Sequence, residues 1–543
     1  MKQNSRRFLS VFLSALMIAA LLLPGLTAFA ACAQDDCPYI IVHGAGAPIV
    51  RRNADGTTTE LFDDGEYIST LVSECLPDLA KGLLTGDWDS YTEKVLDIIL
   101  PAYEGFAPAT DGTLPENSYK AMDHSAVSAN HSLNINSAFH FNPDVRVSPL
   151  DLADELNDYV EQVKAATGHD KVILISRCEG SATLLSYLYE YGRPSGYEGI
   201  QSVCLCDSTL CGMGYIEALF SGTVKVMGDA GLRYMSSLSM EDNTPQTAGV
   251  EQAFDAKLLA QLSELLKETY GVTLTAAMVN RMYGQLKDTL VAEILRAYYA
   301  RVSGNWACVR ERFDEAIDYV FPTEELKAEF APIIANARTF HDDILEHSEE
   351  ILSEVKAAGA DVSLVVEYGY QQYPVSEDSE YVGDILASAA RKSFGATTSK
   401  VEETLPAAYI TRQTVTGFGR YISPDKQIDA STCLFPDSTW FIKNINHDAP
   451  DQTYKLVQTV TTTPGMTVAT DEAYPQYLNY VADSPTLLPL EETNDNDVDW
   501  SWHGPSVIIE LIKKVLNFFS TVFQTVSGWI DGIAGKATAS PVV

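Results

Sequence analysis

The stretch from Lys171 to Leu188 constrains the fold of this chain more than any other. Its first five residues, ending at Ile175, form an apolar run that is typical of a short buried strand. Leu184, Leu185 and Leu188 then recur at helical spacing. A sharp strand-to-helix turn must therefore lie between the two patterns.

That turn carries a cysteine, in the order Ser176-Arg177-Cys178-Glu179-Gly180. Small residues on either side suit a strained turn whose backbone passes close to its neighbours. The turn would place the sulfur at a helix N-terminus, where unpaired N–H groups and the helix dipole favour a thiolate. A buried cysteine in such a corner is also a common packing residue. Cys178 is a candidate nucleophile only if partners for it exist elsewhere in the chain.

Other apolar runs surround this unit and alternate with helical patterns before residue 214. The order predicts an α/β fold with a mostly parallel sheet and helices on both faces. Strand character returns after a largely helical region, so the sheet is expected to be completed beyond an insertion. The further predicted strands cover residues 38–42, 135–141, 200–206, 362–368 and 440–443.

Changes in composition divide the chain into six predicted segments. The fold is expected to be interrupted by a helical cap and followed by an acidic linker and an amphipathic helix. The segments are a signal peptide (1–30), a first part of the core (31–214), the cap (215–358), a second part of the core (359–486), the linker (487–504) and the C-terminal helix and tail (505–543).

The N-terminus has the pattern of a secretory signal peptide. Basic residues precede an apolar run from Phe8 to Leu23, and Ala28-Phe29-Ala30 forms a small-residue cleavage site. Phe29 stands where a lipoprotein signal has a small aliphatic residue, which favours cleavage before Ala31 over lipidation of Cys32. The protein is therefore predicted to be secreted or held at the cell surface.

Net charge limits the partners of the surface. The whole chain carries a formal charge of −37, and removal of the three basic residues of segment 1–30 makes it −40. Nucleic acid and anionic membranes are poor partners for such a surface. No cysteine or histidine cluster has zinc-ligand spacing. We expect neither a metal nor a cofactor.

The C-terminal segment contains one amphipathic helix. Its apolar stripe runs from Ile508 to Trp529 and is interrupted by Lys513, Lys514 and Asn517, so it is not suited to spanning a membrane. We expect this helix to pack on its own chain or on a partner protein. Contact with a membrane surface remains the alternative.

A cysteine nucleophile needs a base and a carboxylate that orients the base. His447 follows the last predicted strand, and Asp425 lies 22 residues before it. Because one connection and one strand fit in that interval, both side chains are expected at the same edge of the sheet. Asp429 is an alternative acid.

The order Cys178, Asp425, His447 resembles the Ser, Asp, His order of α/β hydrolases, over residues 38–214 and 360–450. The segment Phe141-Asn-Pro-Asp-Val-Arg146 is similar to the lipase and lecithin-cholesterol acyltransferase branch. Cysteine replaces serine, Ser176 replaces a glycine, and Lys426 stands where an Asp-Gly turn is usual. These departures bear on the substrate more than on the fold.

The resemblance implies further residues and a function. His43-Gly44-Ala45-Gly46 would supply an oxyanion-hole loop, with the N–H groups of Ala45 and Glu179 as donors. Asp207 becomes a further alternative acid, because some members of the fold carry the acid after that strand. The implied protein is an ester or thioester hydrolase or acyltransferase, working on a small-molecule or lipid-like acyl substrate through an acyl-Cys178 intermediate. The alternative is a catalytically inactive surface binding protein on the same scaffold.

Overall fold

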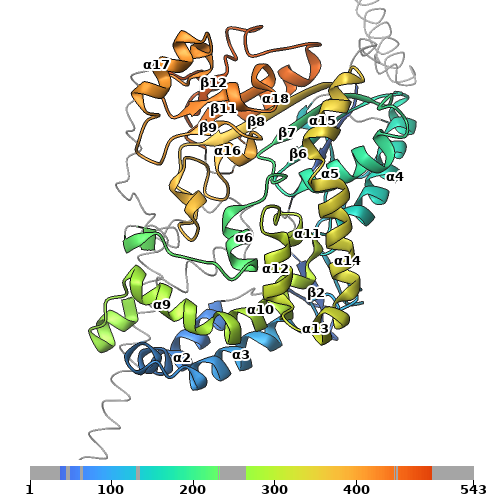
Figure 1. Cartoon of the computed structure of the whole chain (residues 1–543). Helices are drawn as coiled ribbons and strands as arrows, with labels where there is room; N and C mark the ends of the chain where they lie inside the picture. The colour runs from blue at the N-terminus through green and yellow to red at the C-terminus, as the bar shows by residue number, and fades with distance from the viewer. Residues whose placement is uncertain are drawn as a thin grey trace, which may run out of the picture.

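The computed structural model in Figure 1 describes most of the chain between the two terminal segments. The signal peptide predicted for residues 1–30, most of the acidic linker and the C-terminal helix lie outside the described residues. No helix within the described part is long and apolar enough to cross a membrane. The described residues are 37–44, 49–60, 65–129, 135–229, 231–232, 264–445, 447 and 450–491.

An eight-stranded sheet organises the molecule, in the order β13-β12-β11-β8-β7-β6-β1-β5. All of its neighbouring strands are parallel except β12 and β13. The α/β class with a mostly parallel sheet is therefore confirmed. The strands are β1 (Tyr39–Val42), β5 (Phe139–Phe141), β6 (Val172–Arg177), β7 (Ile200–Cys206), β8 (Asp361–Tyr368), β11 (Thr439–Lys443), β12 (Tyr477–Asn479) and β13 (Leu488–Pro489).

Both faces of the sheet are buried, which explains why its strands are continuous apolar runs rather than alternating ones. On one face, Leu174 and its neighbours pack with α4 (Pro149–Thr167), α5 (Gly180–Tyr187) and α15 (Ser348–Ala357). On the other face, Ile173 and Ile175 share a core with α18 (Asp451–Thr462). Helices therefore cover both faces of β6, so that a site on this strand has to lie at one of its ends.

The helix before β6 ends as its sequence predicts. Ser148 caps the N-terminus of α4, its side chain accepting a hydrogen bond from the backbone N–H of Leu150. Gly168 ends the helix with φ of 72°, a left-handed conformation in which glycine has no steric penalty. Only four residues then separate α4 from β6. This short link fixes the start of the strand that leads to Cys178.

A helical region separates β7 from β8, and most of it, apart from α15, lies below the sheet in Figure 1. Its own core contains the buried aromatic side chains of Phe220, Trp306, Phe313 and Phe321. Parallel pairing of β7 with β8 resumes the sheet directly after these helices. The helices of this region are α6 (Gly214–Phe220), α9 (Ala276–Leu286), α10 (Ala292–Ala297), α11 (Ser303–Trp306), α12 (Phe313–Val320), α13 (Glu324–Glu329), α14 (Ala331–Thr339) and α15.

Residues 49–120 add a smaller unit beside that helical region. It contains a three-stranded sheet of β3 (Thr58–Glu60), β2 (Ile49–Arg52) and β4 (Ser118–Lys120), with α2 (Gly65–Thr85) and α3 (Asp89–Tyr103). These two helices share a hydrophobic core with α10, for example through Trp88, Tyr103 and Tyr298. The unit extends the insertion and leaves the main sheet unchanged.

Candidate active site

Cys178 lies in the sharp turn between β6 and α5. Its φ of 51° is in the left-handed region, which is costly for a residue with a side chain and is found most often where a site requires it. Its N–H donates to the carbonyl of Cys206 at the end of β7, and its carbonyl accepts from the N–H and hydroxyl of Ser181. These bonds hold the turn at both ends.

Two glycines make the turn possible. A Cβ on Gly180 would lie 2.3 Å from the carbonyl oxygen of Val42 and 2.6 Å from that of His43, so α5 can start against β1 only with glycine there. A Cβ on Gly44 would lie 3.0 Å from the backbone nitrogen of Glu179 and 3.1 Å from Cβ of Cys178. The loop after β1 therefore passes directly over the nucleophile turn.

His447 lies in the loop after β11, with a left-handed φ of 48°. Its Nδ1 is 2.7 Å from Oδ2 of Asp384, and Cys178 lies close enough to act electrostatically on the ring. The side chain is almost completely buried, at 1% exposure. The structure therefore brings together the predicted nucleophile and the predicted base.

The charges around His447 favour its protonated ring. Burial works to lower the pKa of His447, but the negative charges of Cys178 and Asp384 outweigh it and raise this pKa well above the usual value. For Asp384, burial opposes ionisation, but Lys392 and His447 hold the pKa of the carboxyl far below its usual range. These two shifts favour an imidazolium paired with the ionised carboxylate of Asp384.

The acid that contacts His447 is not Asp425. The Asp425 carboxylate instead bonds to the Tyr368 hydroxyl at 3.0 Å and to the Lys443 ammonium at 2.9 Å. The prediction from spacing misplaced the acid because no strand of the main sheet directly precedes Asp425. The last such strand, β8, ends at Tyr368, and the intervening β9 (Thr397–Thr398) pairs with β10 (Ile428–Asp429) in a separate two-stranded sheet.

The two alternative acids do not contact His447 either. Asp429 accepts hydrogen bonds from the Tyr409 hydroxyl and the Gln413 amide, both at 2.8 Å. Asp207 lies at the end of β7, close to the site, but its Oδ1 accepts from the N–H of Glu367 and from the ammonium of Lys392. Asp207 is therefore a neighbour of the site rather than the partner of His447.

Asp384 was missed in the sequence, although it lies where the topology needs an acid. It follows β8, the strand next to β11, so its loop and the His447 loop leave the sheet side by side. The sequence signal for this turn is the pair Gly383-Asp384. The structure shows why glycine is needed there, since a Cβ on Gly383 would lie 2.2 Å from the carbonyl oxygen of Ala387. A tight Gly-Asp turn after a buried strand indicates a held carboxylate.

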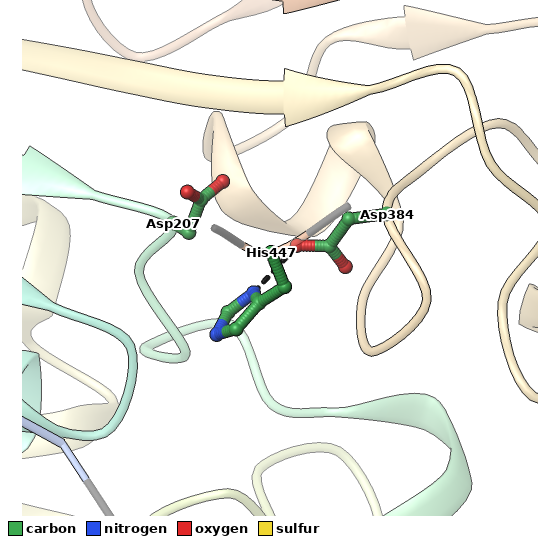
Figure 2. A group of neighbouring side chains, drawn as sticks. All are labelled: Asp207, Asp384 and His447. Atoms are coloured by element: carbon green, nitrogen blue, oxygen red, sulfur yellow. Dashed lines mark hydrogen bonds and ion pairs between the residues drawn. The ribbon is translucent and has the colours of Figure 1, made fainter. Parts of the chain in front are cut away.

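Figure 2 shows how the two carboxylates lie around His447. The dashed line joins the ring to Asp384, whereas the carboxylate of Asp207 is directed away from it. One ligand atom from each of the three residues lies within 4.8 Å of the others, a spacing that a cation could bridge. The Lys392 ammonium already bonds to both carboxylates at 2.8 Å. We therefore assign the positive charge at this place to Lys392.

Of the two residues expected to form the oxyanion hole, the structure describes one, Glu179. Ala45 lies outside the described residues, whereas the backbone nitrogen of Glu179 faces the Gly44 loop. The Glu179 side chain accepts a weak hydrogen bond from the Cys308 thiol, with 3.7 Å between Sγ and Oε1. Burial raises the pKa of Glu179 despite the opposing effects of Cys308 and His447. Burial therefore disfavours the charged form of this carboxyl beside the nucleophile.

Apolar side chains from three separate segments gather over the site. Met213 precedes α6, Cys308 follows α11, and Ile385 and Leu386 directly follow the acid Asp384. All four are buried, and Cys178 itself is 9% exposed. The surroundings of the thiol are therefore apolar and nearly closed to water.

Comparisons with known proteins give little that bears on the site. No family model matches the chain, and no curated protein does. A match among solved structures is one titled "The crystal structure of Tle4-Tli4 complex", with 13% sequence identity and a TM-score of 0.22. The alignment covers 61% of this chain and 74% of that one. A likeness this low carries no argument about function.

Proposed function

We propose that this protein is an acyl hydrolase or acyltransferase of the α/β-hydrolase fold, acting on esters or thioesters. Cys178 is the nucleophile, His447 the base and acid, and Asp384 the residue that orients His447. The observation that carries the proposal is the hydrogen bond of His447 to Asp384, with Cys178 in a left-handed turn close enough to act electrostatically on the ring. Export, predicted from residues 1–30, is part of the same proposal.

The order of strands supports the fold. The nucleophile follows β6, the acid follows β8 and the histidine follows β11, and these strands lie in the sheet in the order β6, β7, β8, β11. The carboxyl ends of parallel strands meet at one edge, so three loops distant in sequence converge there. The same order of nucleophile, acid and histidine is usual in α/β hydrolases.

The reaction proceeds in two half-reactions. The Cys178 thiolate attacks the acyl carbon, and the carbonyl oxygen becomes an oxyanion, for which the N–H of Glu179 is a suitable donor. As the tetrahedral intermediate collapses, His447 gives its proton to the leaving alcohol or thiol, and the acyl group stays on sulfur. The neutral ring then takes a proton from water or an acceptor alcohol, which attacks the thioester. Departure of the thiolate restores the starting state.

Asp384 acts only through His447. Its bond to Nδ1 fixes the tautomer, so that Nε2 is the nitrogen available to the sulfur and the leaving group. The apolar cover of Met213, Ile385 and Leu386 suits an acyl group more than a charged substrate. A small-molecule or lipid-like acyl donor therefore remains the proposed substrate class.

Thiol labelling tests the proposal without a known substrate. Limiting iodoacetamide is expected to alkylate Cys178 first, although Cys37 and Cys211 are more exposed. Peptide mass spectrometry measures the rate at each position. A His447→Gln variant should slow alkylation of Cys178 and leave that of Cys37 unchanged, because Cys178 is the cysteine that interacts electrostatically with the ring among the described residues.

An acyl thioester substrate provides the second measurement. Wild-type protein should form an acyl adduct on Cys178, detected as a mass increase, and Cys178→Ala should form none. Equal alkylation rates at Cys178 and the buried Cys308, together with no adduct, would reject the enzyme. The inactive binding scaffold would then be the better interpretation, and the closed, apolar cover over Cys178 is the observation that favours it.

A further inference from the structure

Lys392 is an almost completely buried basic side chain beside the site. It ends the short helix α16 (Ala389–Lys392), is 1% exposed, and bonds to Oδ1 of Asp207 and Oδ2 of Asp384 at 2.8 Å each. The backbone carbonyl of Glu367 accepts its third hydrogen bond. An ammonium has three donors, so this one is fully used.

The two carboxylates that share Lys392 are competitors. Asp207 follows β7 and Asp384 follows β8, and these strands are neighbours in the sheet. Oxygen atoms of both lie within 4.8 Å of a ring nitrogen of His447. Without a cation, two buried carboxylates at this spacing would hold one proton between them, and either could pair with the histidine.

We propose that Lys392 is a positioning residue that fixes Asp384 as the ionised partner of His447 and holds Asp207 away from the reaction. The inference rests on the proposed function, because it assigns the acid of that same site. Lys392 touches neither the sulfur nor the substrate position. It acts through Asp384, whose other oxygen is held by the N–H groups of Leu386 and Ala387 at 2.8 Å.

Other charged groups face this cluster from the strands behind it. Arg177 at the end of β6 lies 3.9 Å from Glu367 of β8, and both are buried. Burial and then the charge of Asp207 raise the pKa of Glu367 well above its usual value. Burial thus disfavours a charged Glu367, whereas Lys392 bonds directly to both aspartates. Cys206 and Tyr454 also interact electrostatically with Arg177.

The expected result of removing the ammonium follows from charge. In Lys392→Met, Asp207 and Asp384 lose their shared cation, so the pair retains a proton to higher pH. While the proton is on Asp384, His447 lacks an ionised partner and Cys178 reacts slowly. Removing the second carboxylate with Lys392→Met/Asp207→Asn removes the repulsion and should restore part of the rate.

The experiment measures the rate of Cys178 alkylation by iodoacetamide from pH 5 to 9 in the full-length protein. At the acid end, Lys392→Met should react about tenfold more slowly than wild type, the effect of roughly one unit of pKa on the ionised fraction. The difference should shrink as pH rises. Lys392→Met/Asp207→Asn should lie between the two. Thermal unfolding confirms that each variant is folded.

Each other outcome decides against a specific claim. If Cys178 of the wild type is not alkylated preferentially, the proposed function fails and this inference with it. If Cys178 is preferred but Lys392→Met lowers the rate equally at every pH, or leaves it unchanged, only the role of Lys392 is overturned. If Lys392→Met does not fold, Lys392→Met/Asp207→Asn is compared with Asp207→Asn. Equal rates of Cys178 alkylation in these two variants near pH 5 would overturn the inference.

Discussion

Asp384 and Asp425 both lie in the connection between β8 and β11, and the carboxylates of the buried Asp384 and the partly buried Asp425 have equally many bonding partners. Each accepts four hydrogen bonds, and each pairs with a lysine, Lys392 for Asp384 and Lys443 for Asp425. Asp384 bonds to the His447 ring, whereas Asp425 bonds to the phenol of Tyr368. The number of hydrogen bonds to a carboxylate therefore does not identify a candidate catalytic acid. The identity of the group that it bonds, here an imidazole rather than a phenol, is what distinguishes Asp384 from Asp425.

The two lysines differ in what else they hold. Lys392 also binds Asp207, which lies beside the imidazole, so its charge affects the site. Lys443 is the last residue of β11, and its ammonium holds the carboxylate of Asp425. In the proposed mechanism, Lys392 and Asp384 act at the site, whereas Lys443 and Asp425 stabilise the framework. Substitutions at the two places should separate activity from stability.

The largest effect is expected from Asp384→Asn. The amide cannot stabilise an imidazolium and can hold the wrong tautomer, so kcat/KM for a thioester should fall about 10³–10⁴-fold. Asp425→Asn is the matched control and should change kcat/KM by only about threefold, since its partners are not reacting groups. Steady-state kinetics on folded protein measures both. An equal loss in the two variants would end the distinction between the regions.

Lys443→Met should affect stability instead. The side chains of Lys443 and Asp425 are 6% and 10% exposed, so the substitution leaves a nearly buried carboxylate without its cation. Removing one partner of such a pair costs roughly 3 kcal/mol of the free energy of unfolding. Urea denaturation measures this loss. The rate of Cys178 alkylation in the folded variant should stay at the wild-type value, and a slower rate would place Lys443 in the site.

The site residues that can be predicted from the sequence are those marked by the residues next to them in the chain. Cys178 was identified because strand, turn and helix follow one another within 18 residues, and the small residues around it mark the strain. His447 was identified because it follows a short apolar strand late in the chain. Both inferences depend on neighbouring residues, which a sequence displays directly.

The acid depended on which strands pair, and the sequence does not display that. Seventy residues separate β8 from β11, and the pattern around Ile428 has the apolar character of a strand. Only the pairing of β10 with β9 removes it from the main sheet. Asp384 is the carboxylate that reaches His447, because its loop follows β8, the strand next to β11. Lys392 was hidden for the same reason, since its partners lie 8 and 185 residues away.

The smallest expected effect concerns Ser176, the residue that replaces the first glycine of the usual pattern. It is fully buried between Val42 of β1 and Leu205 of β7, and its hydroxyl has no hydrogen-bond partner among the described residues. A buried hydroxyl without a partner costs roughly 1–3 kcal/mol. Ser176→Ala should therefore raise the free energy of unfolding by about 1 kcal/mol in urea denaturation.

Ser176→Gly is the control that separates the hydroxyl from the backbone. It removes the same oxygen but adds the conformational entropy of glycine in a strand, which costs about 0.5–1 kcal/mol. Its stability should therefore fall below that of Ser176→Ala and close to that of the wild type. Neither variant should change the alkylation rate of Cys178, because Ser176 contacts neither the thiol nor His447 among the bonds described. If Ser176→Ala is instead less stable than the wild type, the hydroxyl must have a hydrogen-bond partner. The turn would then depend on a serine at the position where the usual nucleophile motif has glycine.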